Sequence, residues 1–294
     1  MDAPNPSASP TFASRTPLRI GAVGLKARDL NRLAAFYRDA IGLTVLDRDT
    51  KRARLGAGGI TLLELEHAPD AKPDDPRSAG LFHTAFLQPT RGDLARWLVH
   101  AARNRVQLTG ASDHAVSEAI YLDDPEGNGI EVYRDRLPEE WRWNGGRIHM
   151  TTDRLDLDNL AADAGSAAYA RAPDGLRVGH IHLRVGDLDA AQRFYSGIVG
   201  LDVTSGRHGA LFMSSGRYHH HVGSNIWQSA GATLRDEGRA GLSWFNIEAA
   251  DRAALDAVRA RIEASKLLSR AAAGGLELRD PWNTRVRLTL PQAD

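Results

Sequence analysis

An internal repeat is the feature of this sequence that most constrains its fold. The stretch Ile20–Leu30 (IGAVGLKARDL) matches Val178–Leu188 (VGHIHLRVGDL) at an offset of 158 residues. The same register continues through two later pairs: Phe36-Tyr37 with Phe194-Tyr195, and Gly42-Leu43 with Gly200-Leu201. So many matches at a single offset indicate a duplicated structural unit.

Each copy has the pattern of a strand followed by a helix. Apolar and polar residues alternate before Asp29 and Asp187, and a helical pattern follows each of them. We expect these two aspartates to cap the helices, because a side-chain oxygen can accept a hydrogen bond from a free backbone N–H there. Gly42 and Gly200 are expected to end the helices, and further strands follow.

A second, weaker repeat lies between these copies and after them. Gly80–His83 (GLFH) resembles Gly241–Trp244 (GLSW), and each precedes a helical pattern that leads to Asp-Pro and another strand. In this register Glu131 falls opposite Arg287. The sequence therefore predicts four units, joined by a connector over 137–175: 18–67, 79–136, 176–228 and 239–291. A unit of about 50 residues buries little core alone, so pairs of units must share sheets.

Composition excludes several classes of function. The chain of 294 residues has no cysteine, which rules out disulfides, thiolate catalysis, iron–sulfur clusters and Cys-ligated zinc. Lys plus Arg and Asp plus Glu both number 37, so no broad field favours nucleic acid or an anionic membrane. No apolar stretch reaches the ~18 residues of a membrane span. Residues 1–17 lack the pattern of a signal peptide and are expected to be a disordered leader of a cytoplasmic protein.

Four βαβββ units in one chain resemble the vicinal oxygen chelate superfamily, which includes glyoxalases, bleomycin resistance proteins and dioxygenases. Four short segments resemble motifs of its catechol-2,3-dioxygenase-like extradiol branch: Gly80–His83, Asp124–Glu131, Val178–His182 and Tyr218–His221. The resemblance implies an α+β fold in which the four modules form two cup-shaped half-barrels. It also implies metal ligands on inward-facing strands.

Three residues are the candidate metal ligands. Glu131 lies mid-strand and His83 lies in an apolar strand; taken singly, they fit an exposed strand residue and a core histidine. Together with one histidine of the strand containing His180 and His182, they make a set of two histidines and a carboxylate, which suits non-haem Fe(II) and also fits Mn(II). The resemblance selects His180, seven residues before the capping aspartate. His182 is left as a neighbouring or structural residue.

The distribution of these ligands predicts which units pair. The first unit has Ala22 at the ligand position, and the fourth has Trp244 and Arg287. Neither consecutive pair of units holds three ligands, whereas the second and third together do. We therefore expect units two and three to form the metal-binding cup, and units one and four to form a cup without metal.

The resemblance also implies two histidines and a tyrosine around a substrate. The candidates are His114, Tyr121 and one of His219–His221, of which His220 is preferred and His219 comes next. The residues alone leave other interpretations open: His114 as a turn residue, Tyr121 as an ordinary strand aromatic, and the histidine triplet as an exposed strand end. The remaining histidines are expected at the surface: His67, His100, His149 and His208.

These features predict an Fe(II)-dependent extradiol dioxygenase that cleaves a catechol-type aromatic diol with O2. One alternative is a glyoxalase-like, metal-dependent isomerase or lyase, which the histidines at the last strand of the third unit disfavour. The other is a metal-free protein that sequesters small molecules. Neither nucleic acid nor a membrane is an expected partner. The identity of the diol and the oligomeric state, a homo-oligomer included, stay open.

Overall fold

The computed structural model describes residues 11–272 and 274–291 and contains four βαβββ units. The first comprises β1 (Leu18–Ala27), α1 (Leu30–Phe36), β2 (Thr44–Arg48), β3 (Arg52–Ala57) and β4 (Ile60–His67). The second comprises β5 (Gly80–Leu87), α2 (Arg91–Arg103), β6 (Leu108–Asp113), β7 (Ser117–Asp123) and β8 (Gly129–Asp135). The third comprises β12 (Arg177–Arg184), α4 (Leu188–Gln192), β13 (Asp202–Arg207), β14 (Ala210–Ser214) and β15 (Val222–Asn225). The fourth comprises β16 (Gly241–Ala249), α5 (Arg252–Ser265), β17 (Arg270–Ala272), β18 (Gly275–Arg279) and β19 (Arg285–Thr289).

The helix boundaries follow from the local sequence, as expected. The Asp29 carboxylate accepts a hydrogen bond from the N–H of Arg32, and Asp187 does the same for Ala190. Each helix continues into a π-helical turn and ends at a glycine with positive φ, 86° at Gly42 and 95° at Gly200. A residue with a Cβ is strained in that conformation, so glycine stops the helix at low cost.

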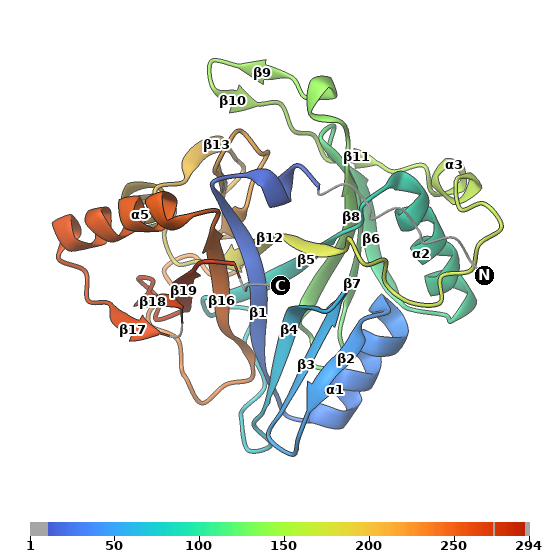
Figure 1. The fold of residues 1–294 in the computed structure, drawn as a ribbon, viewed down its shortest axis with the longest axis horizontal. Coiled ribbons are helices and arrows are strands. Elements are labelled where there is room, and N and C mark those ends of the chain that lie inside the picture. The colour runs from blue at the N-terminus through green and yellow to red at the C-terminus, as the bar shows by residue number, and fades with distance from the viewer. Residues whose placement is uncertain (1–10, 273, 292–294) are drawn as a thin grey trace.

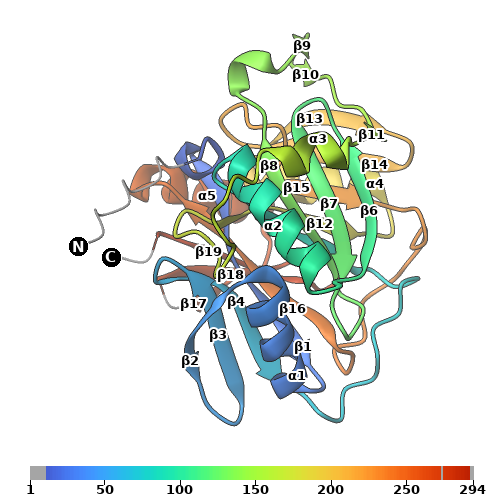
Figure 2. The ribbon, with the colours of Figure 1, turned by 90° about the vertical axis from the view of Figure 1, so that its right-hand side faces the viewer.

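The strands form two large sheets, and the pairing expected from the ligand count is confirmed. One sheet has the order β17-β18-β19-β16-β1-β4-β3-β2 and joins the first and fourth units. The other has the order β11-β6-β7-β8-β5-β12-β15-β14-β13 and joins the second and third (Figures 1 and 2). We call the nine-stranded sheet the histidine cup and the eight-stranded sheet the tryptophan cup, after the residues at their centres.

Contacts between consecutive units tie the two cups together. The hydroxyl of Tyr37 in the first unit donates to the Asp124 carboxylate in the second, at 3.0 Å. Tyr195 in the third unit makes the equivalent bond to Asp280 in the fourth, also at 3.0 Å. The Asp-Pro turns found in the sequence are thus buried anchors. One continuous apolar core extends over both cups, with α1 and α2 on one side of the molecule and α5 on the other (Figure 1).

The connector and the N-terminal segment both pack against the histidine cup. The connector contains a hairpin of β9 (Trp143–Asn144) and β10 (Arg147–Ile148), then β11 (Asp153–Arg154) and α3 (Leu157–Ala162). Strand β11 pairs with β6 and so extends the histidine cup by one edge strand.

The expected disordered leader is corrected for residues 11–17, which are ordered; residues 1–10 lie outside the described part. Residues Ala13–Arg15 form a 3-10 turn, and Ala13 is buried. The Thr16 hydroxyl is hydrogen-bonded to Nε2 of His221. These long-range contacts explain why composition misled here, because a short Pro- and Ser-rich stretch carries little local signal of its partners. Among the described residues, the structure has no helix with the length and apolarity to cross a membrane.

Candidate metal centre

Three adjacent strands at the middle of the histidine cup bring His83, Glu131 and His180 together. Strand β5 lies between β8 and β12, so Ala85 is the register partner of both Glu131 and His180. Nε2 of His83 lies 3.1 Å from Oε2 of Glu131, and Nε2 of His180 lies 3.3 Å from the same oxygen. The two histidine nitrogens are 3.3 Å apart. All three side chains are buried.

This donor set fits a divalent metal ion. Ligand bonds of about 2.0–2.2 Å set near right angles place donor atoms about 3 Å apart. The observed separations of 3.1–3.3 Å match that requirement without rearrangement. Three ligands on one face leave the side toward the pocket open, which is the arrangement of catalytic rather than structural sites.

The electrostatics of the site favour a cation. Burial raises the pKa of Glu131, but His180 and His83 outweigh it and hold the pKa well below its usual range. Burial lowers the pKa of His180 to about 4, with only partial opposition from Glu131. At neutral pH the site therefore presents a buried carboxylate beside an unprotonated His180. A buried negative charge of this kind is costly unless a cation or donor compensates it.

His114 and Tyr121 meet beside this group, as the sequence expected. The hairpin of β7 and β8 places Tyr121 directly opposite Glu131, which explains the ten-residue spacing. His114 Nδ1 lies 2.7 Å from the carbonyl of Thr151, which can only accept, so Nδ1 carries the proton. The unprotonated Nε2 then accepts a hydrogen bond from the Tyr121 hydroxyl at 2.6 Å. Burial, followed by the Glu131 charge, raises the pKa of Tyr121 well above its usual value.

The histidine triplet divides into three environments. His220 lines the pocket, and its ring centroid is 4.1 Å from that of His180. His219 is buried behind it, with Nδ1 2.8 Å from Nδ1 of His220. His221 faces away and bonds Thr16 and Ser214. His182, next to the ligands, lines the pocket and accepts a hydrogen bond from the Asn225 side-chain amide.

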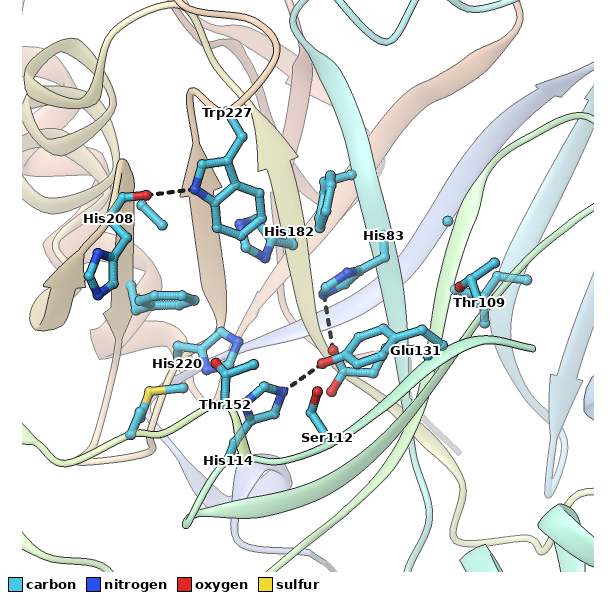
Figure 3. A pocket seen from close by; sticks show the side chains of 18 of the residues that line it. His83, Thr109, Ser112, His114, Glu131, Thr152, His182, His208, His220 and Trp227 are labelled. Atoms are coloured by element: carbon cyan, nitrogen blue, oxygen red, sulfur yellow. Dashed lines mark hydrogen bonds and ion pairs between the residues drawn. The ribbon is translucent and has the colours of Figure 1, made fainter. Parts of the chain in front are cut away.

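A cavity of about 690 Å³ opens in front of these residues (Figure 3). Its walls are largely apolar, with Phe82 and Trp227 partly exposed near the entrance. Several lining residues were not predicted: Met150, Thr152, Arg207 and His208. His208 was expected at the surface, and it is exposed there while it also lines the pocket. Met150 and Thr152 come from the connector, which gave no sequence signal of its position.

The tryptophan cup has a filled centre at the equivalent positions. Trp244 and Arg287 occupy the register positions of His83 and Glu131. The Arg287 guanidinium lies 3.7 Å from the centre of the Trp244 ring, and Trp244 Nε1 donates to Glu66 at 2.9 Å. Ala22 and Gly24 stand where the other cup has His180 and His182. Within the described part of the chain, no cluster of metal-ligating side chains forms in this cup.

Comparisons with known proteins agree with this architecture. The model of the Glyoxalase/Bleomycin resistance protein/Dioxygenase superfamily matches residues 19–132 and 177–288. The chain is 38% identical over 267 residues to catechol-2,3-dioxygenase of Bacillus subtilis (strain 168), covering 89% of this chain and 93% of that protein. It is 36% identical over 99 residues to biphenyl-2,3-diol 1,2-dioxygenase 3 of Rhodococcus globerulus, covering 33% of this chain and 50% of that protein.

Solved structures show the same fold at low sequence identity. A protein from Bacillus subtilis subsp. subtilis str. 168 superposes with a TM-score of 0.63 and 14% identity, covering 93% of this chain and 85% of that chain. Glyoxalase I from Zea mays superposes with a TM-score of 0.57 and 15% identity, covering 93% of this chain and 92% of that chain.

Proposed function

The chain belongs to the Glyoxalase/Bleomycin resistance protein/Dioxygenase superfamily, and we propose that it is an extradiol dioxygenase that cleaves a catechol-type aromatic diol with O2. One observation carries the proposal: the convergence of three ligand atoms with the His114–Tyr121 pair and His220 on one cavity. The relative named catechol-2,3-dioxygenase, which matches over most of both chains, supports the same reaction class.

The proposed ligands are His83, Glu131 and His180, and Fe(II) is the proposed metal. Two neutral imidazoles and one carboxylate on one face suit non-haem Fe(II), and Mn(II) accepts the same donors. When bound, such an ion supplies a redox-active Lewis acid with free coordination positions for small reactants. The protein supplies the position, the proton acceptors and the exclusion of water.

Tyr121 and His114 are proposed to handle a substrate proton. Because the Tyr121 O–H donates to His114 Nε2, the phenol oxygen is left to accept a hydrogen bond from a substrate hydroxyl. A proton taken from that hydroxyl can pass to Tyr121 as the Tyr121 proton passes to His114. The raised pKa of Tyr121 keeps the phenol protonated at the start and end of this exchange.

The remaining pocket residues are proposed to bind and orient the ring. Phe82, Phe212 and Trp227 present aromatic surfaces to the cavity. A cavity of about 690 Å³ is large enough for a substituted aromatic ring. On its other side His220 faces the ligands, where it is proposed to accept and return a second proton.

The test is oxygen uptake by anaerobically purified, Fe(II)-loaded protein with catechol, beside the Glu131→Ala variant. We expect uptake with a yellow ring-opened product in the unmodified protein and none in the variant. One tightly bound metal with no uptake for a panel of aromatic diols, but isomerisation of a hemithioacetal, would favour a glyoxalase-like enzyme instead. Absence of any bound metal would favour a small-molecule binding protein.

A further inference from the structure

We propose that Asp135 and His219 are positioning residues that hold His220 in one tautomer, with the proton on Nδ1 and the unprotonated Nε2 facing the pocket. The hydrogen bonds among these residues follow from the structure and do not depend on the proposed function. Its catalytic consequence rests on the function proposed above.

The chain of hydrogen bonds starts at Asp135, the last residue of β8. Its Oδ1 lies 2.7 Å from Nε2 of His219 and 3.1 Å from the hydroxyl of Tyr218, which donates to it. The His219 side chain is 0% exposed and that of Asp135 is 13% exposed. Residues 131, 133 and 135 of this strand share one face, so the strand that carries the proposed carboxylate ligand also carries the start of this chain.

Donor and acceptor roles follow in order from the carboxylate. An ionised carboxylate only accepts, so the proton of the short bond lies on Nε2 of His219. In the proposed arrangement His219 is neutral and carries only this proton, which leaves its Nδ1 as an acceptor. Nδ1 of His220, at 2.8 Å, must then donate. Nε2 of His220 is left unprotonated.

The free nitrogen faces the reaction site. His220 lines the cavity, and its ring lies against that of His180. Within the described part of the chain, Nε2 of His220 makes no hydrogen bond, whereas Nδ1 does. The proposed tautomer therefore presents a proton acceptor, and not a donor, to a ligand hydroxyl at the start of a reaction.

The residues around these hydrogen-bonded side chains restrict their conformations. Tyr133 contributes a hydroxyl 2.8 Å from that of Tyr218, and because Tyr218 donates to Asp135, Tyr133 donates to Tyr218. A Cβ at residue 179 would lie 1.9 Å from the Tyr133 hydroxyl oxygen, so glycine is required next to His180. A buried network of this kind restricts the rotamers of its members.

The direct test is the tautomer of His220 in the Zn(II)-loaded, diamagnetic protein. Long-range 1H–15N correlation spectra of protein labelled at histidine report which ring nitrogen carries the proton, with His220 assigned by its loss in His220→Gln. We expect Nδ1–H. A proton on Nε2 in the unmodified protein would overturn the proposal without any variant. This measurement needs no turnover, so it stands or falls separately from the proposed dioxygenase activity.

Two substitutions of His219 separate positioning from packing. His219→Leu fills the space but removes the acceptor, and should scramble the tautomer and lower kcat by about 10²-fold while KM for the diol changes little. In His219→Asn the amide oxygen lies near the place of Nδ1, so this variant should restore the tautomer and most of kcat. Equal losses in both variants would mean that His219 only packs.

Asp135 is tested with Tyr218→Phe as the matched control, because both substitutions remove a bond to the same oxygen. Asp135→Ala should give a mixture of His220 tautomers and a lower kcat, since nothing then holds the proton of His219 on Nε2. Tyr218→Phe should leave the tautomer of His220 unchanged. An unchanged tautomer in Asp135→Ala would remove Asp135 from the proposal.

Discussion

The histidine cup and the tryptophan cup have the same strand order apart from the edge strand β11, and four register-equivalent positions at their centres carry different chemistry. His83 and Glu131 on one side correspond to Trp244 and Arg287 on the other, and His180 and His182 correspond to Ala22 and Gly24. Three residues of the first set, His83, Glu131 and His180, bring their ligand atoms within 4.8 Å of one another. In the second set the indole ring of Trp244 lies against Gly24.

The difference teaches how one fold supports two kinds of centre. In the tryptophan cup the Arg287 charge lies over the indole, and Glu66 accepts from the indole N–H. The polar groups of these side chains therefore satisfy one another. In the histidine cup the carboxylate and imidazoles face one another and a cavity, which is stable only with a compensating cation or donor. Strand order sets the cup, and the inward side chains set what it does.

The largest expected difference between the cups is metal retention. His83→Ala should lower the affinity for Fe(II) or Mn(II) by more than about 100-fold. Loss of a residue that only hydrogen-bonds to a metal ligand often costs about 10–100-fold, and loss of a ligand should cost more. Arg287, the residue of the tryptophan cup at the position of Glu131, provides the control. The variant Arg287→Ala should keep full metal content. Metal per chain after dialysis measures both. Retained metal in His83→Ala would disprove the ligand assignment.

Replacing a glycine beside each centre by alanine should test how tightly the side chains of that centre are packed. In Gly24→Ala the added Cβ would lie 2.2 Å from Nε1 of Trp244, so we expect a loss of about 3 kcal/mol in the free energy of unfolding, with metal content unchanged. In Gly223→Ala of the histidine cup, the Cβ would lie 2.9 Å from Cγ of His182. This smaller overlap should displace the His182 ring into the cavity and reduce turnover more than stability.

Urea unfolding and turnover of the two glycine variants decide between these outcomes. The comparison fails if Gly24→Ala is as stable as the unmodified protein, because the indole would then have room to move.

A fall in pH should destabilise the histidine cup before the tryptophan cup. Burial is the main cause that lowers the pKa of His221 from 6.5 to about 3. Below pH 6.5 the unfolded chain binds a proton that the folded chain does not, so stability falls as the pH falls. The expected loss is about 2 kcal/mol between pH 7 and pH 5. The equivalent position in the tryptophan cup, Leu62, carries no titratable group.

Hydrogen exchange at the two pH values provides the measurement. Protection should fall in β15 and in residues 11–17, which His221 binds through Thr16, more than in β4. His221→Gln should flatten the dependence of stability on pH. An equal fall in both cups would place the acid-sensitive groups elsewhere.

The smallest expected effect is on the hydrogen bond at the centre of the tryptophan cup. Trp244→Phe removes the donor to Glu66 and weakens the stacking of Arg287, so we expect a loss of about 1 kcal/mol in the free energy of unfolding. Metal content and turnover should not change. A thermal or urea unfolding curve beside an oxygen-uptake assay checks both, and a fall in turnover would show that the two centres are coupled.

Much of the fold could be predicted because its signals are local. The aspartate caps, the glycine helix stops and the repeat offset are written within a few residues of the elements that they define. The pairing of the second and third units could be predicted for a different reason, since only that pair brings three ligands together. The ten-residue spacing of Tyr121 and Glu131 likewise reports a hairpin register.

The rest of the site depends on contacts between distant segments. Met150 and Thr152 reach the pocket because the connector is held by bonds from Arg207 and His114, and no local pattern shows those bonds. The order of residues 11–17 depends on His221, more than 200 positions away. Within His219–His221 the preference for His220 comes from the family resemblance, because strand alternation alone does not say which face meets the cavity.

The sequence by itself therefore determined the modules, their boundaries and the candidate ligand types, because helix capping, strand alternation and residue chemistry act over short distances. Only the tertiary structure decided which histidine of the triplet faces the pocket, which one is hydrogen-bonded to it, and how Trp244 and Arg287 contact each other in the other cup. Those outcomes depend on where buried polar groups find partners, and a buried donor or acceptor is satisfied by whatever the fold brings within about 3 Å of it.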